Sequence, residues 1–183
     1  MLPFIPLSVP RIERPVAPGL LLAVNRRHIL LRDGGQPCCF PDLPTHVFTD
    51  APLMRIGNLG DYPCYAWDLP EDTAAAPPGL LAETRSALDR LSRDEQHAFS
   101  RARELLFWRQ HHRFCGACGA ETVLSEREIA AVCRECGSMF FPQIAPAVIV
   151  AIHHGDRLLL AHNRNFKEGL YSLIAGFVEA GEN

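Results

Sequence analysis

Apolar runs separated by short polar turns mark two segments near the start of the chain. Residues 20–32 read as apolar run, turn and apolar run, and residues 54–69 repeat this form around a Gly-Asp pair. Two such runs joined by a short turn predict a β-hairpin in each segment. Residues 70–79 are rich in proline and alanine and cannot form a regular ladder of hydrogen bonds. We therefore predict a β-rich domain and a linker over residues 1–79.

The pattern changes at residues 80–113, which contain neither proline nor glycine and whose apolar residues recur at spacings of three, four and seven. This periodicity predicts an amphipathic helix, or two, with arginine and glutamate on the outer face. The apolar stripe consists of Leu88, Leu91, Ala98, Ala102 and Leu105. We interpret this stripe as core rather than as a partner site. The aromatic residues Phe107, Trp108 and Phe114 lead into the next segment and are expected to pack it onto the helix.

Four of the seven cysteines form two Cys-x2-Cys pairs with fourteen residues between them, and a glycine follows each pair. Glycine suits the tight turn of a zinc knuckle, because it readily adopts a positive φ. Four thiolates complete a tetrahedral zinc shell without a position for water, so the predicted zinc is structural. The predicted ligands are Cys115, Cys118, Cys133 and Cys136. Free core thiols, a redox pair or bound iron remain as alternatives for these cysteines.

Short apolar runs return after this predicted zinc ribbon, which spans residues 114–141. Residues 147–152 read as a buried strand, 153–156 as a turn and 157–161 as a second strand. A third apolar stretch follows at residues 173–178. The cysteines outside the ribbon, Cys38, Cys39 and Cys64, are interpreted as buried or half-buried thiols.

Composition narrows the possible functions. The chain of 183 residues is 48% hydrophobic and carries a formal net charge of −3, so it can bury a sizeable core but has no strong positive field to attract a polyanion. Its first residues lack the basic and apolar regions of a signal peptide, and no apolar run approaches the ~20 residues of a membrane span. These features predict a cytoplasmic protein without a membrane partner.

Two further motifs flank the strands after the ribbon. Residues 141–146 read Phe-Pro-Gln-Ile-Ala-Pro, and residues 175–179 read Ala-Gly-Phe-Val-Glu. Together with the zinc spacing that precedes them, these motifs resemble the NAD(H) pyrophosphatases of the Nudix hydrolase superfamily. In that family a zinc ribbon is followed by an aromatic-Pro-Gln-Ile-Ala-Pro stretch and then by the Nudix fold.

The resemblance implies an enzyme that hydrolyses the diphosphate of NADH or NAD+ to nicotinamide mononucleotide and AMP, and related enzymes also remove an NAD cap from RNA. The Nudix box has the form G-x5-E-x7-R-E-U-x-E-E-x-G-U, where U is a bulky apolar residue. Gly176 and Glu182 occupy its first two fixed positions, and the printed sequence stops at Asn183, within the box. The paired glutamates that supply oxygen ligands to Mg2+ or Mn2+ come later in the box. We therefore expect this chain itself to be inactive.

The same resemblance assigns peripheral site residues. The backbone carbonyl of Ala175 would bind Mg2+ or Mn2+, Phe141 and Phe177 would flank the nicotinamide or adenine ring, and Glu128 and Ile149 would line the same pocket. Each residue also has a plain structural interpretation: the two phenylalanines as core aromatics, and Glu128 as a solvated turn residue. Glu182 is expected to shape the loop before the catalytic helix rather than to act as the base.

These observations predict an α+β fold with a mixed amino-terminal domain, a helical segment at 80–113, the zinc ribbon, and the first strands of an incomplete α/β/α Nudix sandwich at 142–183. In the family two subunits pair so that the aromatic residue at the place of Phe141 reaches the pocket of the other subunit. The resemblance therefore also implies a homodimer.

Two alternatives to the enzyme remain open. The first is a non-catalytic zinc-ribbon protein that only binds a partner or dimerises. The second is a zinc-ribbon module for nucleic acid, which the ribbon does not favour, because Arg127 and Arg134 are offset by four nearby glutamates.

Overall fold

The computed structural model describes residues 3–15, 18–32, 35–40, 53–69 and 80–182. The chain divides into two compact units, Met1–Pro142 and Gln143–Asn183. The linker predicted at 70–79 lies outside the described residues, as do the side chains of Cys38 and Cys39.

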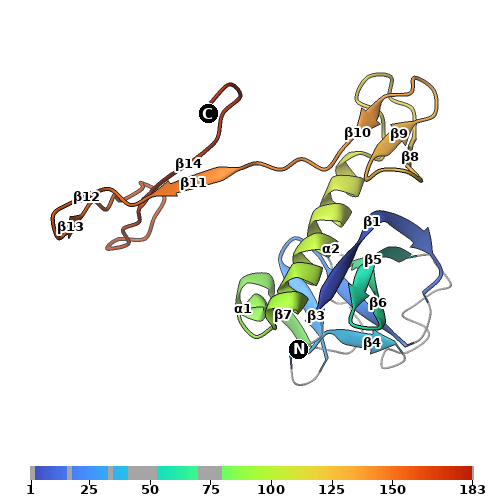
Figure 1. Ribbon diagram of the computed structural model, residues 1–183, viewed down its shortest axis with the longest axis horizontal. Coiled ribbons are helices and arrows are strands. Elements are labelled where there is room, and N and C mark those ends of the chain that lie inside the picture. The colour runs from blue at the N-terminus through green and yellow to red at the C-terminus, as the bar shows by residue number, and fades with distance from the viewer. Residues whose placement is uncertain (1–2, 16–17, 33–34, 41–52, 70–79, 183) are drawn as a thin grey trace. The chain divides into compact units, whose positions relative to one another are not determined.

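A mixed seven-stranded sheet forms the centre of the first unit (Figure 1), with the strand order β1-β5-β6-β2-β3-β7 and with β4 paired to β2. The pairing of β2 with β6 is parallel, and the other pairings are antiparallel. With the helices described below, this sheet confirms the predicted α+β class. The strands are β1 (Phe4–Glu13), β2 (Gly19–Val24), β3 (His28–Leu31), β4 (Cys38–Phe40), β5 (Leu53–Leu59), β6 (Tyr62–Asp68) and β7 (Leu80–Glu83).

Both predicted hairpins are present. In the turn between β2 and β3, the Asn25 side-chain oxygen accepts hydrogen bonds from the backbone N–H groups of Arg27 and His28, at 2.9 and 2.8 Å. The turn between β5 and β6 contains Gly60 with φ of 58°, a conformation that glycine adopts at little cost. Local side-chain and backbone chemistry therefore closes each turn.

Two buried clusters lie on opposite faces of the sheet, and β2 contributes to both. Leu20, Leu22 and Val24 belong to one cluster, and Leu21 and Ala23 belong to the other. Side chains alternate across a strand, so a strand buried on both faces needs apolar residues at every position. This requirement explains the uninterrupted run LLLAV that the sequence shows.

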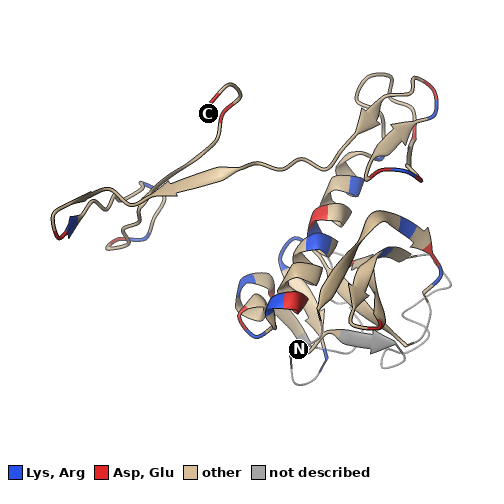
Figure 2. Ribbon diagram, viewed as in Figure 1, with Lys and Arg blue, Asp and Glu red and all other residues tan. Residues whose placement is uncertain are grey.

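The helix α2 (Arg93–His111) covers the first of these faces, and α1 (Thr84–Leu88) precedes it. The residues of α2 that are buried are Ala98, Phe99, Ala102, Leu105 and Trp108, so the predicted stripe is core. Charged residues of both signs lie along the outer side of this helix, among uncharged ones (Figure 2). None of the described helices combines the length and the apolar content that crossing a bilayer requires.

The segment predicted as helical from residue 80 begins with a strand. Residues Leu80–Glu83 form β7, which pairs with all four residues of β3. Ala82 packs against one buried cluster and Leu81 against the other, an alternation that a strand provides and a helix does not. Tertiary pairing thus overrides the local helical pattern at this end of the segment.

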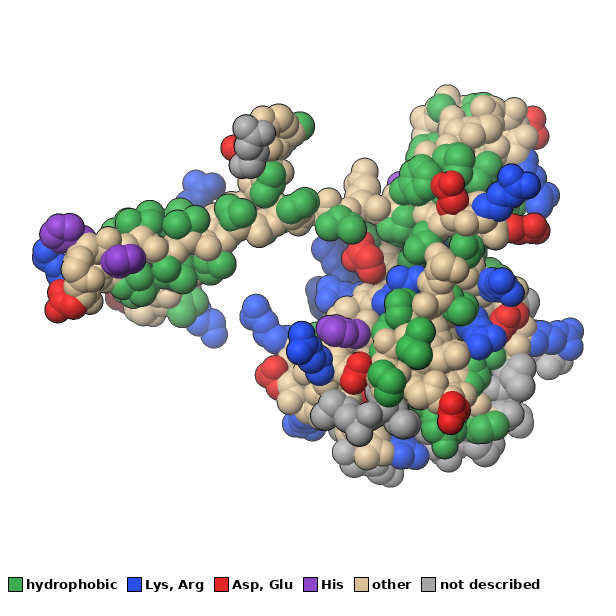
Figure 3. Space-filling view, viewed as in Figure 1, with side chains coloured by type: hydrophobic (Ala, Val, Ile, Leu, Met, Phe, Trp, Pro, Cys, Tyr) green, Lys and Arg blue, Asp and Glu red, His purple; other side chains and the backbone are tan. Residues whose placement is uncertain are grey.

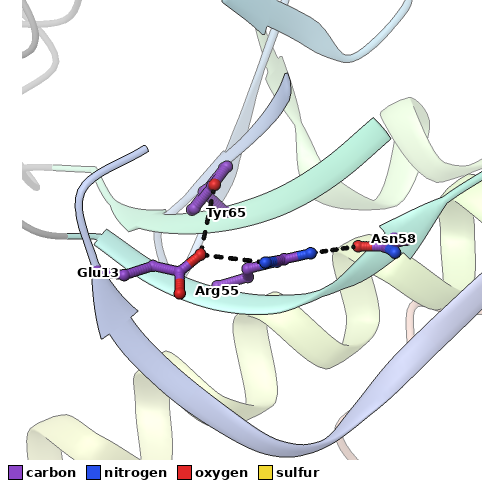
Figure 4. Close-up of polar contacts among 4 residues, drawn as sticks. All are labelled: Glu13, Arg55, Asn58 and Tyr65. Carbon is purple, nitrogen blue, oxygen red and sulfur yellow. Dashed lines mark hydrogen bonds and ion pairs between the residues drawn. The ribbon is translucent and has the colours of Figure 1, made fainter. Parts of the chain in front are cut away.

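A cluster of polar side chains joins β1, β5 and β6 (Figure 4). Glu13 accepts a hydrogen bond from the Arg55 guanidinium at 3.3 Å and another from the Tyr65 hydroxyl at 3.4 Å, while Arg55 also donates to Asn58 at 3.0 Å. The Arg55 and Glu13 side chains are about 30% exposed. Solvent screening limits such a pair to about 1 kcal/mol, so the cluster mainly fixes the end of β1.

The second unit contains four short strands: β11 (Ala147–Val150), β12 (His153–His154), β13 (Arg157–Leu158) and β14 (Ile174–Phe177). β11 pairs with β14, and β12 pairs with β13. The strands predicted at 147–152, 157–161 and 173–178 are therefore present but shorter. The first was predicted to be buried, but all four residues of β11 are exposed. The two histidines predicted as part of a turn form β12, and the turn is confined to Gly155 and Asp156. Apolar side chains gather on the surface of this unit (Figure 3).

The first prediction concerns the start of α2, where a capping box closes the helix. The Ser92 hydroxyl accepts a hydrogen bond from the Glu95 N–H, and the Glu95 carboxylate accepts one from the Ser92 N–H at 2.7 Å. Ser92→Ala should lower the free energy of unfolding by about 1 kcal/mol, because it leaves a helix N–H without its partner.

Urea unfolding followed by circular dichroism measures this loss. Ser100→Ala, the same substitution at an exposed position of the same helix, is the matched control and should change stability by less than about 0.5 kcal/mol. An equal loss in both variants would contradict the role of the cap.

Candidate metal centre and substrate-site residues

The predicted zinc ribbon is a small three-stranded antiparallel sheet in the order β10-β9-β8. Its strands are β8 (Thr122–Leu124), β9 (Ala131–Cys133) and β10 (Met139–Phe140). Two tight turns carry the cysteine pairs, and the glycine after each pair has a positive φ, 78° at Gly119 and 75° at Gly137. The backbone N–H groups of these glycines donate to the carbonyls of Cys115 and Cys133. The conformation that the sequence predicted for both glycines is therefore confirmed.

The four sulfur atoms converge on one point. Cys115 lies 3.5 Å from Cys136, and Cys118 lies 3.5 Å from Cys133 and 3.6 Å from Cys136, measured between Sγ atoms. A tetrahedral zinc with Zn–S bonds of about 2.3 Å requires sulfurs about 3.8 Å apart, whereas a disulfide requires about 2 Å. The sulfur set therefore fits a zinc ion and excludes a disulfide in this arrangement. Among the described residues, no other group of three or more histidine, cysteine or acidic side chains converges in this way.

Hydrogen bonds prepare some of these sulfurs for the thiolate form. Hydrogen bonds from the hydroxyl and backbone of Ser138 lower the pKa of Cys136 to about 6, with the two Oγ and Sγ atoms 3.1 Å apart. At Cys118 a backbone hydrogen bond from Ala120 lowers the pKa, but the three surrounding thiols together raise it to about 12. Close sulfurs cannot all carry negative charge without a cation among them. A divalent ion at the centre would remove this conflict.

The chemistry of the donor set indicates a structural role for that ion. Four protein sulfurs fill the shell, so no position is left for a water or a substrate. Zinc would supply folding free energy here by holding the two turns together. Cys64 is separate from this set: it is fully buried in the sheet, and desolvation raises the pKa of its thiol to about 12.

A single arginine fastens the ribbon to the helix. From the last turn of α2, the Arg109 guanidinium donates to the carbonyl of His112 and to the hydroxyl and carbonyl of Thr122, each at 2.9 Å. The ring of His112 lies 5.6 Å from that of Phe140 in β10, between centroids. Sequence analysis did not single out Arg109, because an arginine in a helical pattern is expected on the solvent-exposed face.

Of the aromatic residues expected to pack the ribbon onto the helix, only Trp108 is buried. Phe107 and Phe114 are 53% and 59% exposed. Phe140 takes their place against the buried cluster, together with Leu124 and Ile129 of the ribbon.

The residues assigned to substrate fall in both units. Glu128 is an exposed residue of the ribbon, where its backbone N–H donates to the Ser125 hydroxyl at 3.2 Å, and Phe141 follows β10 with half of its surface exposed. In the second unit Ile149 is paired with Ala175 across β11 and β14. Phe177 ends β14 and is 71% exposed. The structure thus brings Ile149 and Ala175 together directly.

The residues that the sequence analysis assigned to the start of a Nudix box form a strand followed by a tight loop. Gly176 lies in β14 opposite Val148 of β11. After the strand, the Glu182 carboxylate accepts a hydrogen bond from the backbone N–H of Glu179 at 2.8 Å, and the Glu182 N–H donates back to the Glu179 carbonyl. These two hydrogen bonds join Glu182 to Glu179 within the loop, and the role that the resemblance implies for Glu182 stays a prediction.

The fold and the sulfur site define a zinc-ribbon protein with a mixed amino-terminal sheet, and comparison with known families agrees. The family model for the NADH pyrophosphatase zinc ribbon domain matches residues 110–141. The model for the NADH pyrophosphatase-like rudimentary NUDIX domain matches residues 18–108. The chain belongs to the NADH pyrophosphatase family of Nudix proteins.

Several curated relatives carry the name NAD-capped RNA hydrolase NudC. The chain is 36% identical to the protein of Haemophilus influenzae (strain Rd) over 149 residues, which are 77% of this chain and 54% of that protein. It is 49% identical to the Pectobacterium carotovorum protein over 76 residues, 42% of this chain and 29% of that protein. It is 41% identical to a Yersinia pestis protein over 105 residues, 57% and 40% of the two chains. The chain thus spans at most about half the length of these relatives.

The second prediction tests the metal centre. The purified chain should contain about one zinc per subunit, and Cys133→Ser should lose it, because three thiolates and a hydroxyl hold zinc far more weakly than four thiolates. Elemental analysis of the dialysed protein measures the ratio. Cys64→Ala is the control, because it removes a cysteine outside the sulfur set and should leave the zinc content unchanged. Equal zinc in the Cys133 variant and the parent would refute the ligand assignment.

Proposed function

We propose that this chain is the amino-terminal and zinc-ribbon part of an enzyme that hydrolyses the diphosphate of NADH or NAD+, giving nicotinamide mononucleotide and AMP. The observation that carries the proposal is the order of the parts: the rudimentary NUDIX domain, the zinc ribbon and then β14 with the first residues of the Nudix box. The names of the relatives support NAD-capped RNA as a further substrate. Residues 142–183 are then the start of the catalytic Nudix domain.

The proposed chemistry needs divalent cations in addition to the structural zinc. Mg2+ or Mn2+ would neutralise the phosphoryl oxygens and orient the attacking water. Of the ligands, this chain would contribute the backbone carbonyl of Ala175, which lies within β14 next to Gly176. The loop closed by Glu182 leads into the position of the catalytic helix, whose glutamates would supply the remaining oxygen ligands.

The proposed substrate contacts are aromatic and peripheral. Phe177 and Phe141 both expose large ring surfaces, as residues that stack on a nicotinamide or adenine ring must in the absence of substrate. Ile149, beside Ala175, would supply apolar contact, and Glu128 would supply a polar one. We also propose a cytoplasmic location, because reducing conditions keep four thiolates available for zinc.

The third prediction compares the activity of this chain with that of a polypeptide that contains the complete catalytic site. A polypeptide of residues 1–183 should release no AMP from NADH in millimolar Mg2+ or Mn2+, since it contains only Gly176 and Glu182 of the box. The same polypeptide extended through the remaining box and catalytic domain should release AMP and nicotinamide mononucleotide. Chromatography of the products measures both.

Chelation provides the control for this assay. Removal of the divalent cations by EDTA should stop hydrolysis by the extended chain and leave the folded ribbon intact if zinc is retained. Chelator-sensitive AMP release by residues 1–183 alone would show that the missing glutamates are unnecessary. Failure of the extended chain on NADH, NAD+ and NAD-capped RNA would reject the proposed function.

A non-catalytic binding or dimerisation protein is the second candidate function, and the exposed apolar surface of the ribbon favours it. Met139 and Phe141 are 43% and 50% exposed at the end of the ribbon. Exposed apolar side chains that form a contiguous patch mark interaction sites. Dimerisation is also compatible with the enzyme, so the hydrolysis assay above distinguishes the two candidates.

The fourth prediction concerns pairing of subunits. We expect a homodimer at micromolar concentration, because pairing would cover the apolar surface around Met139 and Phe141, and light scattering measures the mass. In the extended chain, Phe141→Ala should weaken NADH binding by about tenfold at unchanged zinc content, because it removes a stacking contact. A monomer would reject the pairing, and unaltered NADH affinity would reject the proposed contact of Phe141.

A further inference from the structure

A hollow of about 720 Å³ lies in the first unit, and none of its lining residues belongs to the ribbon or was assigned to NADH. Its walls are the turn after β2, the end of β6, the helix α1 and the outer flank of α2. This volume lies within the range of about 300–1,000 Å³ that small-molecule sites occupy. The metal centre and the box residues leave this hollow without an assigned role.

The floor of the hollow is apolar and includes one unsatisfied hydroxyl. Val24, Ile29 and Phe99 line it, and each is at most 2% exposed. Thr84 also lines it, and its Oγ1 is buried without a hydrogen-bond partner. An unpaired buried hydroxyl destabilises a fold, and rotation about χ1 exchanges the hydroxyl and methyl of a threonine. A ligand with a polar edge would give this hydroxyl a partner.

An aromatic pair and two guanidinium groups lie at the solvent-exposed opening of the hollow, which we call its mouth. The rings of Phe107 and His111 lie 4.1 Å apart between centroids, and Phe107 is 53% exposed. Arg26 and Arg103 also line the hollow, and no hydrogen bond or ion pair holds either side chain within the described part of the chain. Two acidic residues, Glu104 on the same flank and Asp68 at the end of β6, line the hollow as well. The mouth therefore offers a stacking surface together with donors suited to an oxyanion.

We propose that this hollow binds a nucleotide, with the base over the apolar floor against Phe107 and the phosphate at Arg26 and Arg103. A purely apolar ligand would leave the guanidiniums and Thr84 without partners, and a free sugar phosphate would not use the aromatic ring. A nucleotide supplies a flat ring with a polar edge and an anion at the required places. The same chemistry comes from a free mononucleotide or from a nucleotide within an RNA chain.

Calorimetric titration of the zinc-loaded chain with AMP and with adenosine, both without divalent cations, tests the proposal. Phe107→Ala should weaken both ligands by about tenfold, because stacking on an aromatic ring contributes on this scale. Arg103→Gln should weaken AMP but not adenosine, because only AMP carries the phosphate. The matched controls, Phe114→Ala and Arg93→Gln, change equally exposed residue types outside the hollow and should leave both affinities unchanged.

Thr84→Val supplies an independent readout. It should weaken AMP binding while leaving the unfolding midpoint of the free protein equal or higher, because the unpaired hydroxyl is gone. A lower midpoint in the free protein would show that the hydroxyl serves the fold and would remove it from the site.

A 5′-phosphorylated RNA trinucleotide identifies the source of the nucleotide. Tighter binding of the RNA than of AMP, weakened by Phe107→Ala, would assign the hollow to an RNA chain, and equal binding would assign it to free mononucleotides. Absence of binding by both, or binding that survives Phe107→Ala and is lost in Phe177→Ala, would overturn the proposal. This test is independent of the proposed function, because the residues assigned to NADH hydrolysis lie outside the lining of the hollow and hydrolysis is measured in a separate assay.

Discussion

The packing of α2 is the constraint on which the rest of the first unit depends. Its buried stripe closes one face of the sheet, and Arg101 on its flank donates to the backbone carbonyls of Leu7 and Ile56, at 2.6 and 3.2 Å, so that β1 and β5 are tied to the helix. Burial lowers the pKa of Arg101, but the guanidinium remains charged at any physiological pH. In the last turn of the helix, Arg109 holds the ribbon. One helix thus carries the two attachments that turn a sheet and a small metal module into a single unit.

This arrangement also explains why the metal site alone does not position the ribbon. Zinc would close the two knuckles on each other, but it makes no bond to α2. The contacts to the helix are the Arg109 hydrogen bonds and the packing of Phe140, Leu124 and Ile129. Because the Thr122 hydroxyl also donates to the carbonyl of His112, the last turn of the helix and β8 share one hydrogen-bond network. The order inside the ribbon and its attachment to the helix therefore have different physical origins.

The sequence predicted those features that local chemistry determines. Cysteine spacing and the following glycines fixed the sulfur site, and alternation of apolar runs and turns located both hairpins. The strand β7 was missed because its pairing with β3 is a long-range contact with no local signature. Arg109 was missed for the same reason: its partner Thr122 lies beyond the end of the helix, and nothing in the spacing of the residues connects them. The prediction that Phe114 packs the ribbon onto the helix was wrong, because Phe114 is exposed. The sequence shows that an aromatic residue precedes a metal ligand, but it does not show whether another part of the fold lies against that ring.

Residues in the last two turns of α2 contact two different parts of the first unit. Arg109 and His112 hold the ribbon, while Phe107, Gln110 and His111 line the hollow, and Gln110 donates to Asp68 at the end of β6. Residues on adjacent faces of the same helical turn share the backbone that positions them. A ligand that favours one arrangement of this turn would change the stability of the ribbon. The zinc-loaded ribbon would then change the free energy of ligand binding by the same amount, because coupling between two sites is reciprocal.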